Sequence, residues 1–337
     1  MEHVAIDLGG RESQICVRSS RGEIVEEKRI RSEDIEGYLS KRPPSRVVVE
    51  TCAEAFVVAD AIKRAGHEVR VVPSVLVPAL GVGQRQTKTD RRDAQILSEV
   101  STRIDLPSVH IPSAESRRRR AMCTMRDALV SSRTQLINSI RGWMRTVGLR
   151  VRASRSKLVA TLRLEHDATL PSYVKRQMEV IEELDAQIHK ADEELKGVAK
   201  ADETCRRLMT VPGIGPVTAV QYVATLDTVT RFEGAHRVQS YLGLTPGERS
   251  SSDRQQRTGI TKAGNPAMRR LLVQAAWAAR RSRRAGRLLQ WTLEIEKRRG
   301  KFVATVALAR KLAGIAYAIW RDGSTYKESP TVTAATA

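Results

Sequence analysis

The chain has 337 residues and a formal net charge of +20 at pH 7, from 58 lysines and arginines against 38 aspartates and glutamates. This length exceeds what one hydrophobic core usually supports, so at least two domains are expected. Aromatic residues make up 4%, too few for an RNA-binding platform of stacked rings. The four scattered cysteines exclude a disulfide scaffold or zinc finger and favour a reducing cytoplasm. No run approaches about 18 apolar residues, so neither a membrane span nor a signal peptide is expected.

The surplus positive charge is concentrated in two blocks. Residues 114–170 and 266–301 each carry a net charge of +9, whereas residues 1–113 are neutral overall. Clustered arginines attract nucleic-acid backbones, because a guanidinium can hold a phosphate through two hydrogen bonds. Nucleic acid is therefore favoured as a partner over a solvated basic face or a membrane surface. The side chains expected to contact phosphates are Arg117, Arg118, Arg119, Arg120, Arg280, Arg281, Arg283 and Arg284.

The first third of the chain alternates strand and helix signals. We expect strands over residues 4–7, 12–18, 23–30, 47–50 and 69–72, and helices over 32–39 and 53–65. Ser32 is placed to cap the first helix, and Thr89 is placed to cap a later one that runs to about Arg103. A meander followed by alternating helices and strands predicts a mixed sheet covered by helices, that is, an α/β domain over residues 1–113.

Beyond residue 113 the strand signals give way to helical spacing. The two longest periodic segments predict a helical hairpin that links two domains over residues 114–203. Residues 204–328 are expected to form a compact all-α domain, followed by a flexible tail over residues 329–337.

The second domain carries a glycine-rich turn. The run Val211-Pro212-Gly213-Ile214-Gly215 before a helix resembles the hairpin of helix-hairpin-helix modules, in which Gly213 and Gly215 would let backbone amides approach a phosphate. A plain turn before a helix has the same appearance. Lys262, just ahead of a helix that starts at Pro266, is a further candidate phosphate contact.

Four carboxylates stand out by their positions. Asp7 and Glu50 each end a predicted strand, and Asp90 and Asp93 lie three residues apart on one face of the helix capped by Thr89. Converging carboxylates suit one or two Mg²⁺ ions, since hard cations prefer oxygen ligands and assist chemistry at a phosphate. For Asp90 and Asp93 by themselves, a helix-capping role beside neighbouring arginines stays open.

The run Ser250-Ser251-Ser252 is the second chemical candidate. A serine in a basic loop before a helix can attack a phosphodiester when a base or a metal assists it. Serine clusters are also common in flexible loops, and this alternative stays open. The sequence has no Walker lysine loop and no Gly-x-Ser-x-Gly elbow, and its six histidines are scattered without metal-ligand spacing.

Taken in order, these segments resemble the DEDD transposases of insertion sequences, which are related to pilin-gene invertases and described as bridge-RNA-guided serine recombinases. The resemblance covers most of the chain and rests on Ile6-Asp7, Val49-Glu50-Thr51, Lys88-Thr89-Asp90-Arg91-Arg92-Asp93-Ala94, Val211-Pro212-Gly213-Ile214-Gly215, Tyr241-Leu242-Gly243-Leu244-Thr245-Pro246 and Gly259-Ile260-Thr261-Lys262-Ala263-Gly264-Asn265.

The resemblance implies a RuvC-like, RNase H-type first domain whose four acids, here Asp7, Glu50, Asp90 and Asp93, bind Mg²⁺. It implies a C-terminal transposase domain with a serine, here Ser251, that forms a covalent phosphoserine link to donor and target DNA. It further implies a homodimer that assembles to a tetramer with composite sites, and a non-coding RNA that pairs with both DNAs. Such an enzyme works in the cytoplasm, at the nucleoid.

Some alternatives remain at this point. Ser252 stands where the family usually has a glycine, so Ser250 and Ser252 are rival nucleophiles. A metal-dependent Holliday-junction-type nuclease needs the acids but no serine chemistry. Residues 6–10 also resemble a phosphate motif of actin-like sugar kinases, although that class needs a second Asp-x-Gly strand end and an adenosine loop that the sequence lacks. A non-enzymatic DNA-binding protein leaves the four carboxylates unexplained.

Overall fold

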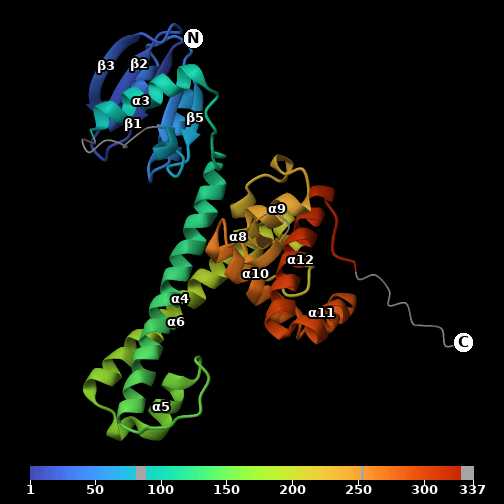
Figure 1. Ribbon diagram of the computed structural model, residues 1–337. Coiled ribbons are helices and arrows are strands. Elements are labelled where there is room, and N and C mark those ends of the chain that lie inside the picture. Colours follow the sequence, from blue (N-terminus) through green and yellow to red (C-terminus); the bar gives the residue numbers. More distant parts are fainter. Residues whose placement is uncertain (81–88, 252–253, 328–337) are drawn as a thin grey trace, which may run out of the picture. The chain divides into compact units, whose positions relative to one another are not determined.

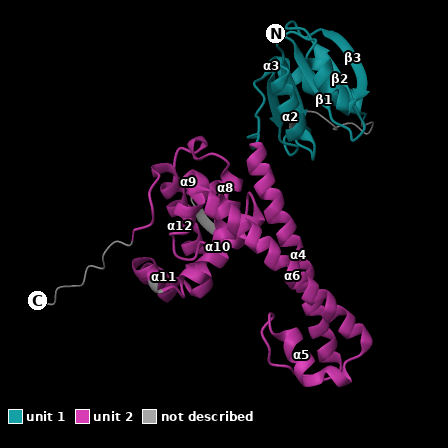
Figure 2. Ribbon diagram, turned by 180° about the vertical axis from the view of Figure 1, so that it is seen from behind, with its two compact units in different colours: residues 1–112 teal, residues 113–337 magenta. Residues whose placement is uncertain are grey.

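The computed structural model of the chain describes residues 1–80, 89–251 and 254–327. The chain divides into two compact units, Met1–Pro112 and Ser113–Ala337, and each is described by itself (Figure 2). A further boundary at residue 203 stays a prediction.

Unit 1 is built on a five-stranded mixed sheet, as the strand and helix signals predict. Its strands are β1 (His3–Asp7), β2 (Glu12–Arg18), β3 (Ile24–Arg31), β4 (Arg46–Glu50) and β5 (Glu68–Val72). Their order in the sheet is β3-β2-β1-β4-β5. The meander β1-β2-β3 is antiparallel, and β4 and β5 extend the sheet in parallel with β1. The central strand β1 therefore has an antiparallel neighbour on one side and a parallel neighbour on the other.

Helices cover both faces of this sheet (Figure 1). They are α1 (Ile35–Leu39), α2 (Ala55–Arg64) and α3 (Asp90–Arg103), with short 3-10 helices η1 (Ser32–Asp34) and η2 (Val77–Leu80). Because side chains alternate along a strand, Ile6 and Val49 pack in the core shared with α1 and α2, whereas Ala5 and Val48 pack with Leu97 of α3. This alternation separates unit 1 into two apolar layers.

The predicted cap at Ser32 is wrong. The hydroxyl of Ser32 donates to the carbonyl oxygen of Gly9 at 2.7 Å, and the 3-10 helix η1 comes before α1. Thr89, by contrast, caps α3 as predicted, since its side chain accepts a hydrogen bond from the amide of Arg92.

Unit 2 begins with a long helical hairpin. It consists of α4 (Ala114–Thr146) and α6 (Ser172–Ala201), joined through α5 (Leu158–His166) and the 3-10 helix η3 (Asp167–Thr169) (Figure 1). At the closed end of the hairpin, Ile140 and Met144 of α4 pack with Leu162 of α5 and Met178 of α6. The closed end thus has an apolar core of its own.

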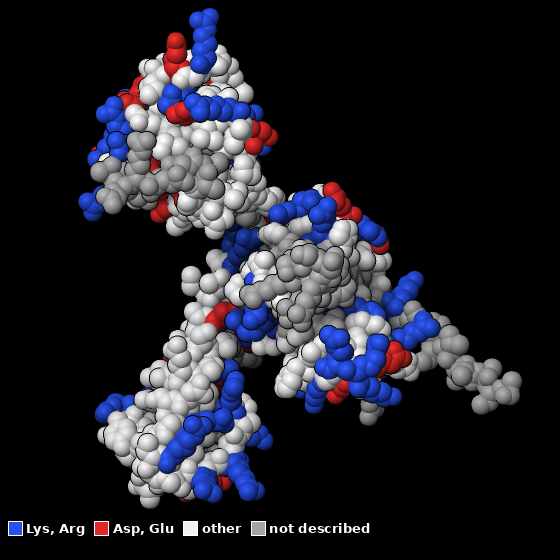
Figure 3. All heavy atoms as spheres, viewed as in Figure 1, with Lys and Arg blue, Asp and Glu red and all other residues white. Residues whose placement is uncertain are grey.

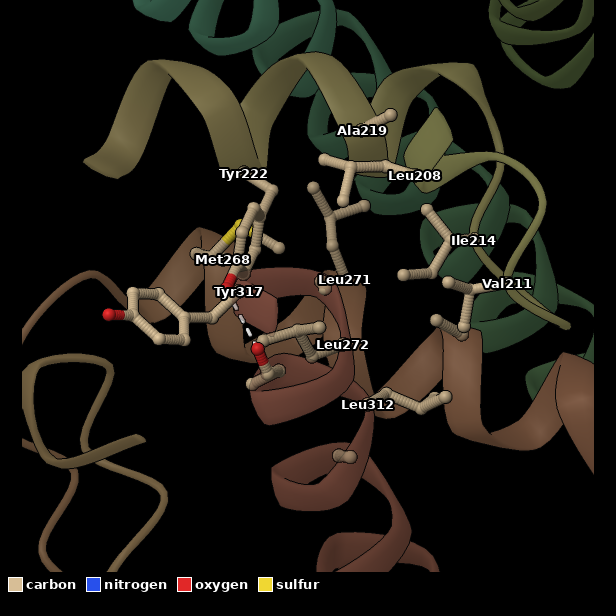
Figure 4. Close-up of a cluster of buried hydrophobic side chains, with 14 of the residues drawn as sticks. Leu208, Val211, Ile214, Ala219, Tyr222, Met268, Leu271, Leu272, Leu312 and Tyr317 are labelled. Atoms are coloured by element: carbon tan, nitrogen blue, oxygen red, sulfur yellow. Dashed lines mark hydrogen bonds between the residues drawn. The ribbon is translucent and has the colours of Figure 1, made fainter. Parts of the chain in front are cut away.

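The rest of unit 2 is a helical body around a second core. Its helices are α7 (Glu203–Leu208), α8 (Pro216–Leu226), α9 (Ala235–Tyr241), α10 (Pro266–Ala279), α11 (Gly286–Arg299) and α12 (Lys301–Asp322), with η4 (Val229–Arg231) and η5 (Arg283–Ala285). Tyr222 of α8, Leu272 of α10 and Leu312 of α12 meet at its centre (Figure 4). The buried hydroxyl of Tyr222 donates to the carbonyl oxygen of Ala313 at 2.8 Å, so no polar group of this ring is left unsatisfied.

The expectation of an all-α second domain is wrong at one place. Strand β6 (Pro246–Ser251) pairs antiparallel with β7 (Arg254–Ile260), and the serines expected in a loop belong in part to this hairpin. The segment is almost entirely polar and shows no apolar alternation, so its sequence gives no strand signal.

Helix α12 bears on the expectation that the chain contains no membrane span. In the part of the chain that the structure describes, it is the one helix long and apolar enough to cross a membrane by length and composition. Half of its apolar window, 50%, is buried, and Leu308, Leu312 and Tyr317 belong to the core of unit 2. These contacts account for the apolar character of α12 as that of a core helix.

Candidate active site

Two of the predicted acids end neighbouring strands in unit 1. Ile6 of β1 pairs with Val49 of β4 in a parallel ladder, so the next residues, Asp7 and Glu50, lie side by side at the same edge of the sheet. Asp7 also stands opposite Gln14 in β2, and Glu50 stands opposite Val72 in β5. Parallel strands bring their carboxyl ends together, and this pair of strands ends in two carboxylates.

The pleat of the sheet places both acids on the face covered by α3. Ala5 and Val48 precede the two acids by two residues, and both pack in the apolar layer that contains Leu97 of α3. Residues two apart in a strand share a face. Asp7 and Glu50 are therefore directed to the side of the sheet on which α3 lies.

Helix α3 crosses the face of the sheet, and its hydrogen bonds establish its direction. His3, at the start of β1, lies 2.8 Å from the hydroxyl of Ser101 near the end of α3. Further along β1, Ala5 pairs with Cys16, whose sulfur accepts a hydrogen bond from Ser98 at 3.2 Å. Earlier still in α3, Gln95 and Arg91 bond to Glu27 of β3, which pairs with Cys16, so the first half of the helix lies over β3.

The first turn of α3 carries the other two acids. Asp93 is buried, with 6% of its surface exposed, whereas Asp90 is exposed. Asp93 thus faces the sheet and Asp90 faces solvent. The structure brings Asp7 and Glu50 together at one edge of the sheet, and the described residues contain no group of three acid, histidine or cysteine side chains close enough to hold a metal ion.

Sequence reasoning missed the residue that holds this turn in place. Glu27 of β3 accepts hydrogen bonds from Gln95 at 2.5 Å and from the Arg91 guanidinium, both in α3. The hydrogen bond from Arg91 lowers the pKa of the Glu27 carboxyl, so this bridge is between charged groups at neutral pH. No sequence signal could have found it, because Glu27 and Arg91 are 64 residues apart.

The serine candidates occupy the end of the hairpin in unit 2. By register, Ser250 stands opposite Gln255 and Ser251 stands opposite Arg254. The remaining rival, Ser252, lies outside the described residues. The backbone thus places a basic residue across from Ser251 and a neutral one across from Ser250.

The predicted phosphate contacts on α4 are engaged mostly within the protein. Glu115 accepts hydrogen bonds from Arg118 at 2.8 Å and from Arg119 at 2.7 Å, and Arg119 also donates to Asp202 at 2.8 Å. Arg120 donates to the carbonyl oxygen of Ala224 at 2.7 Å, at the end of α8. These bonds dock α4 onto the helical body, and phosphate binding by residues 117–120 stays a prediction.

This network lowers the pKa of both carboxyls that take part in it. The hydrogen bonds from Arg118 and Arg119 lower the pKa of Glu115 to about 2. Burial acts to raise the pKa of Asp202, but the amide of Cys205 and the Arg119 guanidinium outweigh it, so this pKa is lowered. Both carboxylates are therefore charged at neutral pH and hold the arginines in place.

The second basic block contains arginines that are bonded within the protein and one that is exposed. Arg280 forms an ion pair with Glu296 and lies 5.5 Å from the centroid of the Trp277 ring. Arg284 donates to the carbonyl oxygen of Thr210 at 3.0 Å, while Arg281 is exposed. The fourth predicted contact, Arg283, belongs to the 3-10 helix η5.

The glycine turn before α8 packs against protein backbone. Gly213 has a φ of +87°, and a Cβ added there would lie 2.1 Å from the carbonyl oxygen of Ala275 in α10. Gly215 precedes α8 with nothing within 4 Å of an added Cβ. Lys262 is exposed and also has a positive φ, +57°, a conformation that costs free energy in a non-glycine residue. Phosphate binding by these three residues stays a prediction.

Comparison with known proteins decides the family. A model described as "Transposase IS116/IS110/IS902 family" matches residues 205–290, and a DEDD transposase model of the IS110 type, described as "Transposase", matches residues 4–149. The transposase for insertion sequence element IS1328 of Yersinia enterocolitica is 30% identical over 337 residues, covering 96% of this chain and 98% of that protein. The chain belongs to the IS116/IS110/IS902 family of transposases.

Other relatives agree over nearly the whole transposase. The transposase for insertion sequence element IS1111A of Coxiella burnetii is 28% identical over 340 residues, covering 96% of this chain and 91% of that protein. A probable family 20 transposase of Pseudomonas aeruginosa is 26% identical over 337 residues, covering 97% and 99% of the two chains. The protein is therefore an enzyme that acts on DNA, and the alternative of an actin-like sugar kinase is wrong.

The matched ranges coincide with the candidate residues. The DEDD transposase range, 4–149, contains the mixed sheet and α3 with all four acids, in a domain whose fold is RuvC-like. The other range, 205–290, contains the β6–β7 hairpin with Ser251.

Proposed function

We propose that this insertion-sequence transposase cuts and rejoins DNA with the carboxylates of unit 1 and the Ser251 hydroxyl of unit 2. The observation that carries the proposal is that Asp7 and Glu50 end neighbouring parallel strands on the face covered by α3, the helix that contains Asp90 and Asp93, within the range matched by the DEDD transposase model. A metal-assisted phosphate reaction needs several carboxylates together, and these elements are the ones that contain the four predicted acids.

The donor set suits a divalent cation of the magnesium type. Asp7, Glu50, Asp90 and Asp93 offer only carboxylate oxygens, which Mg²⁺ prefers over the nitrogen and sulfur ligands typical of zinc sites. One or two Mg²⁺ ions bound there would supply positive charge to the reacting phosphate and lower the pKa of a nucleophile. Asp93 would be the anchor, because it is buried and held by α3, while exposed Asp90 can turn to the ion when it binds.

The covalent step assigned to Ser251 balances as a transesterification. The serine oxygen forms a bond to phosphorus as the bond from phosphorus to the leaving sugar oxygen breaks. The hydroxyl proton passes to a basic group, and the leaving oxygen receives a proton in return. The second exchange reverses these bonds with the hydroxyl of a different DNA end. Energy of the phosphodiester is conserved throughout, so no nucleotide cofactor is needed.

Ser251 is chosen over its neighbours by position in the hairpin. It stands opposite Arg254 in the backbone register of the hairpin. Ser250 stands opposite a neutral residue, Gln255. Arg254 is thereby part of the same proposal.

Recognition of sequence is proposed to lie with a non-coding guide RNA that pairs with donor and target DNA. The family resemblance motivates this proposal, together with the lack of an evident base-reading element in the sequence. We further propose that dimers assemble to a tetramer and that the enzyme acts at the cytoplasmic nucleoid. A single structured RNA, encoded beside the gene and purified with the protein, is expected; random nucleic-acid fragments would contradict guidance.

The alternative is a metal-dependent nuclease without serine chemistry, and two substitutions separate it from the proposal. Asp93→Asn is expected to abolish strand exchange under either mechanism while DNA binding persists. Ser251→Ala is expected to abolish strand exchange only if the serine is the nucleophile, with Ser250→Ala as the matched control that retains activity. Full strand exchange by Ser251→Ala would favour the nuclease.

A further inference from the structure

The loop between α4 and α5, residues 147–157, presents a row of basic side chains at the closed end of the hairpin. Arg150, Arg152, Arg155 and Lys157 are all exposed, and no acidic residue occurs from 145 to 157. Figure 3 shows blue side chains gathered over this end of unit 2, with little red among them. We call residues 147–157 the tip loop.

The tip loop alternates between inward apolar and outward basic residues. Leu149, Val151 and Ala153 pack against the apolar core of the closed end, and the intervening Arg150 and Arg152 face solvent. An extended segment directs successive side chains to opposite sides. The burial of every second residue therefore fixes the outward direction of the arginines.

Hydrogen bonds hold the tip loop on the hairpin at several points. The chain turns after α4 at Gly148, which has a φ of +69°. The amide of the next residue, Leu149, donates to the carbonyl oxygen of Met144 at 2.8 Å. The guanidinium of Arg141 donates to the carbonyl oxygen of Ala153 at 3.0 Å. Arg141 therefore anchors the tip loop, and the basic side chains of the loop project from a fixed backbone.

The charged side chains of the tip loop have no bonding partner among the described residues. Across the described residues, the side chains of Arg150, Arg152, Arg155 and Lys157 form no hydrogen bond or ion pair. Nearby acids already have cations of their own: Arg163 pairs with Glu182 at 2.7 Å on the same hairpin. Four like charges held close together repel one another, and a polyanion would relieve that repulsion.

We propose that the tip loop binds the phosphate backbone of duplex DNA, through Arg150, Arg152, Arg155 and Lys157. Duplex is favoured over single-stranded nucleic acid because the loop contains no aromatic residue on which unpaired bases could stack. Among the arginines predicted from sequence at the start of the same helix α4, Arg119 and Arg120 also bond to residues of the helical body, whereas the tip-loop cations lie at the other end of α4.

The proposal rests on the enzyme's action on DNA and is independent of the metal and serine chemistry. Its test is equilibrium binding of the full chain to a short duplex DNA of unrelated sequence, without divalent metal, over a range of salt concentrations. The variant is Arg150→Ala/Arg152→Ala/Arg155→Ala. The matched control removes three exposed charges of unit 1 through Arg21→Ala/Lys41→Ala/Lys63→Ala.

The tip-loop variant is expected to bind duplex DNA at least about tenfold more weakly, and the slope of log affinity against log salt should fall by about 3, one for each lost phosphate contact. The control should leave both quantities near those of the wild type. The conservative variant Arg150→Lys/Arg152→Lys/Arg155→Lys should restore most of the affinity, which excludes misfolding as the cause.

An unchanged salt slope in the tip-loop variant would overturn the proposal, and so would a loss seen with duplex RNA but not with duplex DNA. Failure of the serine mechanism gives a different result. If Ser251→Ala exchanges strands normally, the proposed chemistry is wrong, while the DNA affinity that defines the tip loop is unaffected.

Discussion

A Cβ on residue 213 would lie 2.1 Å from the carbonyl oxygen of Ala275, so the turn before α8 packs directly on the backbone of α10. Gly213 also has a φ of +87°, which side chains rarely adopt. The glycine pattern before α8 is therefore explained, at this position, by helix packing.

Substitution of the two glycines separates packing from phosphate binding. Gly213→Ala should destabilise unit 2 by at least about 2 kcal/mol, from backbone strain and overpacking together. Gly215→Ala should cost less than about 1 kcal/mol, since an added Cβ there has no neighbour within 4 Å. Chemical denaturation of both variants checks this, and equal costs would contradict the assigned packing role.

The network around Glu115 predicts an acid-sensitive contribution to stability. Its carboxyl has a pKa of about 2 in the folded protein against 4.5 in the unfolded chain. A lowered pKa means that the stabilisation is complete above pH 4.5 and is lost as the pH falls toward 2. The difference in unfolding free energy between wild type and Glu115→Gln should therefore shrink over this interval. A difference that is independent of pH would show that Glu115 contributes nothing through its charge.

Glu27 is expected to act on catalysis by positioning the first turn of α3. Glu27→Ala removes the acceptor for Arg91 and Gln95, and we expect at least about a tenfold loss of strand exchange, as for other residues that orient metal ligands. Glu27→Gln keeps an acceptor and should retain more activity. The control Glu12→Ala breaks an exposed ion pair with Arg29 on the same sheet and should change activity little. Equal effects of Glu27→Ala and Glu12→Ala would refute the positioning role.

Unit 1 also yields a test of the metal ligands. Asp93→Asn keeps the shape of the buried side chain but removes its charge, so DNA binding and the thermal transition should stay close to those of the wild type while strand exchange is lost. Removal of divalent metal by a chelator should have the same effect, and added Mg²⁺ should restore the wild type only. Activity that survives both treatments would show that the acids serve structure alone.

Much of unit 1 could be predicted from local sequence. Short apolar runs that end in an acid reveal the ends of β1 and β4, and the cap at Thr89 places Asp90 and Asp93 in one helical turn. These features depend on neighbouring residues, which is why the strand ends and the helix cap could be predicted without a structure.

The rest depends on contacts between distant parts of the chain. The hydrogen bond from Arg120 to Ala224 spans 104 residues, so local sequence could not reveal that this predicted phosphate contact also bonds to α8. The β6–β7 hairpin is held by backbone pairing between polar residues, a pattern that hydrophobic periodicity does not reveal. The outward row of tip-loop arginines likewise becomes visible only once the intervening residues are seen to pack inward.

The most direct test of the account is to identify the residue that becomes linked to DNA during strand exchange. The transposase is incubated with its nucleic acids and Mg²⁺, denatured and digested, and the peptides that retain a nucleotide are sequenced by mass spectrometry. The account predicts a phosphodiester on Ser251 in the wild type and none in Ser251→Ala or Asp93→Asn. Efficient strand exchange without any protein–DNA link, or a link to a different residue, would contradict it.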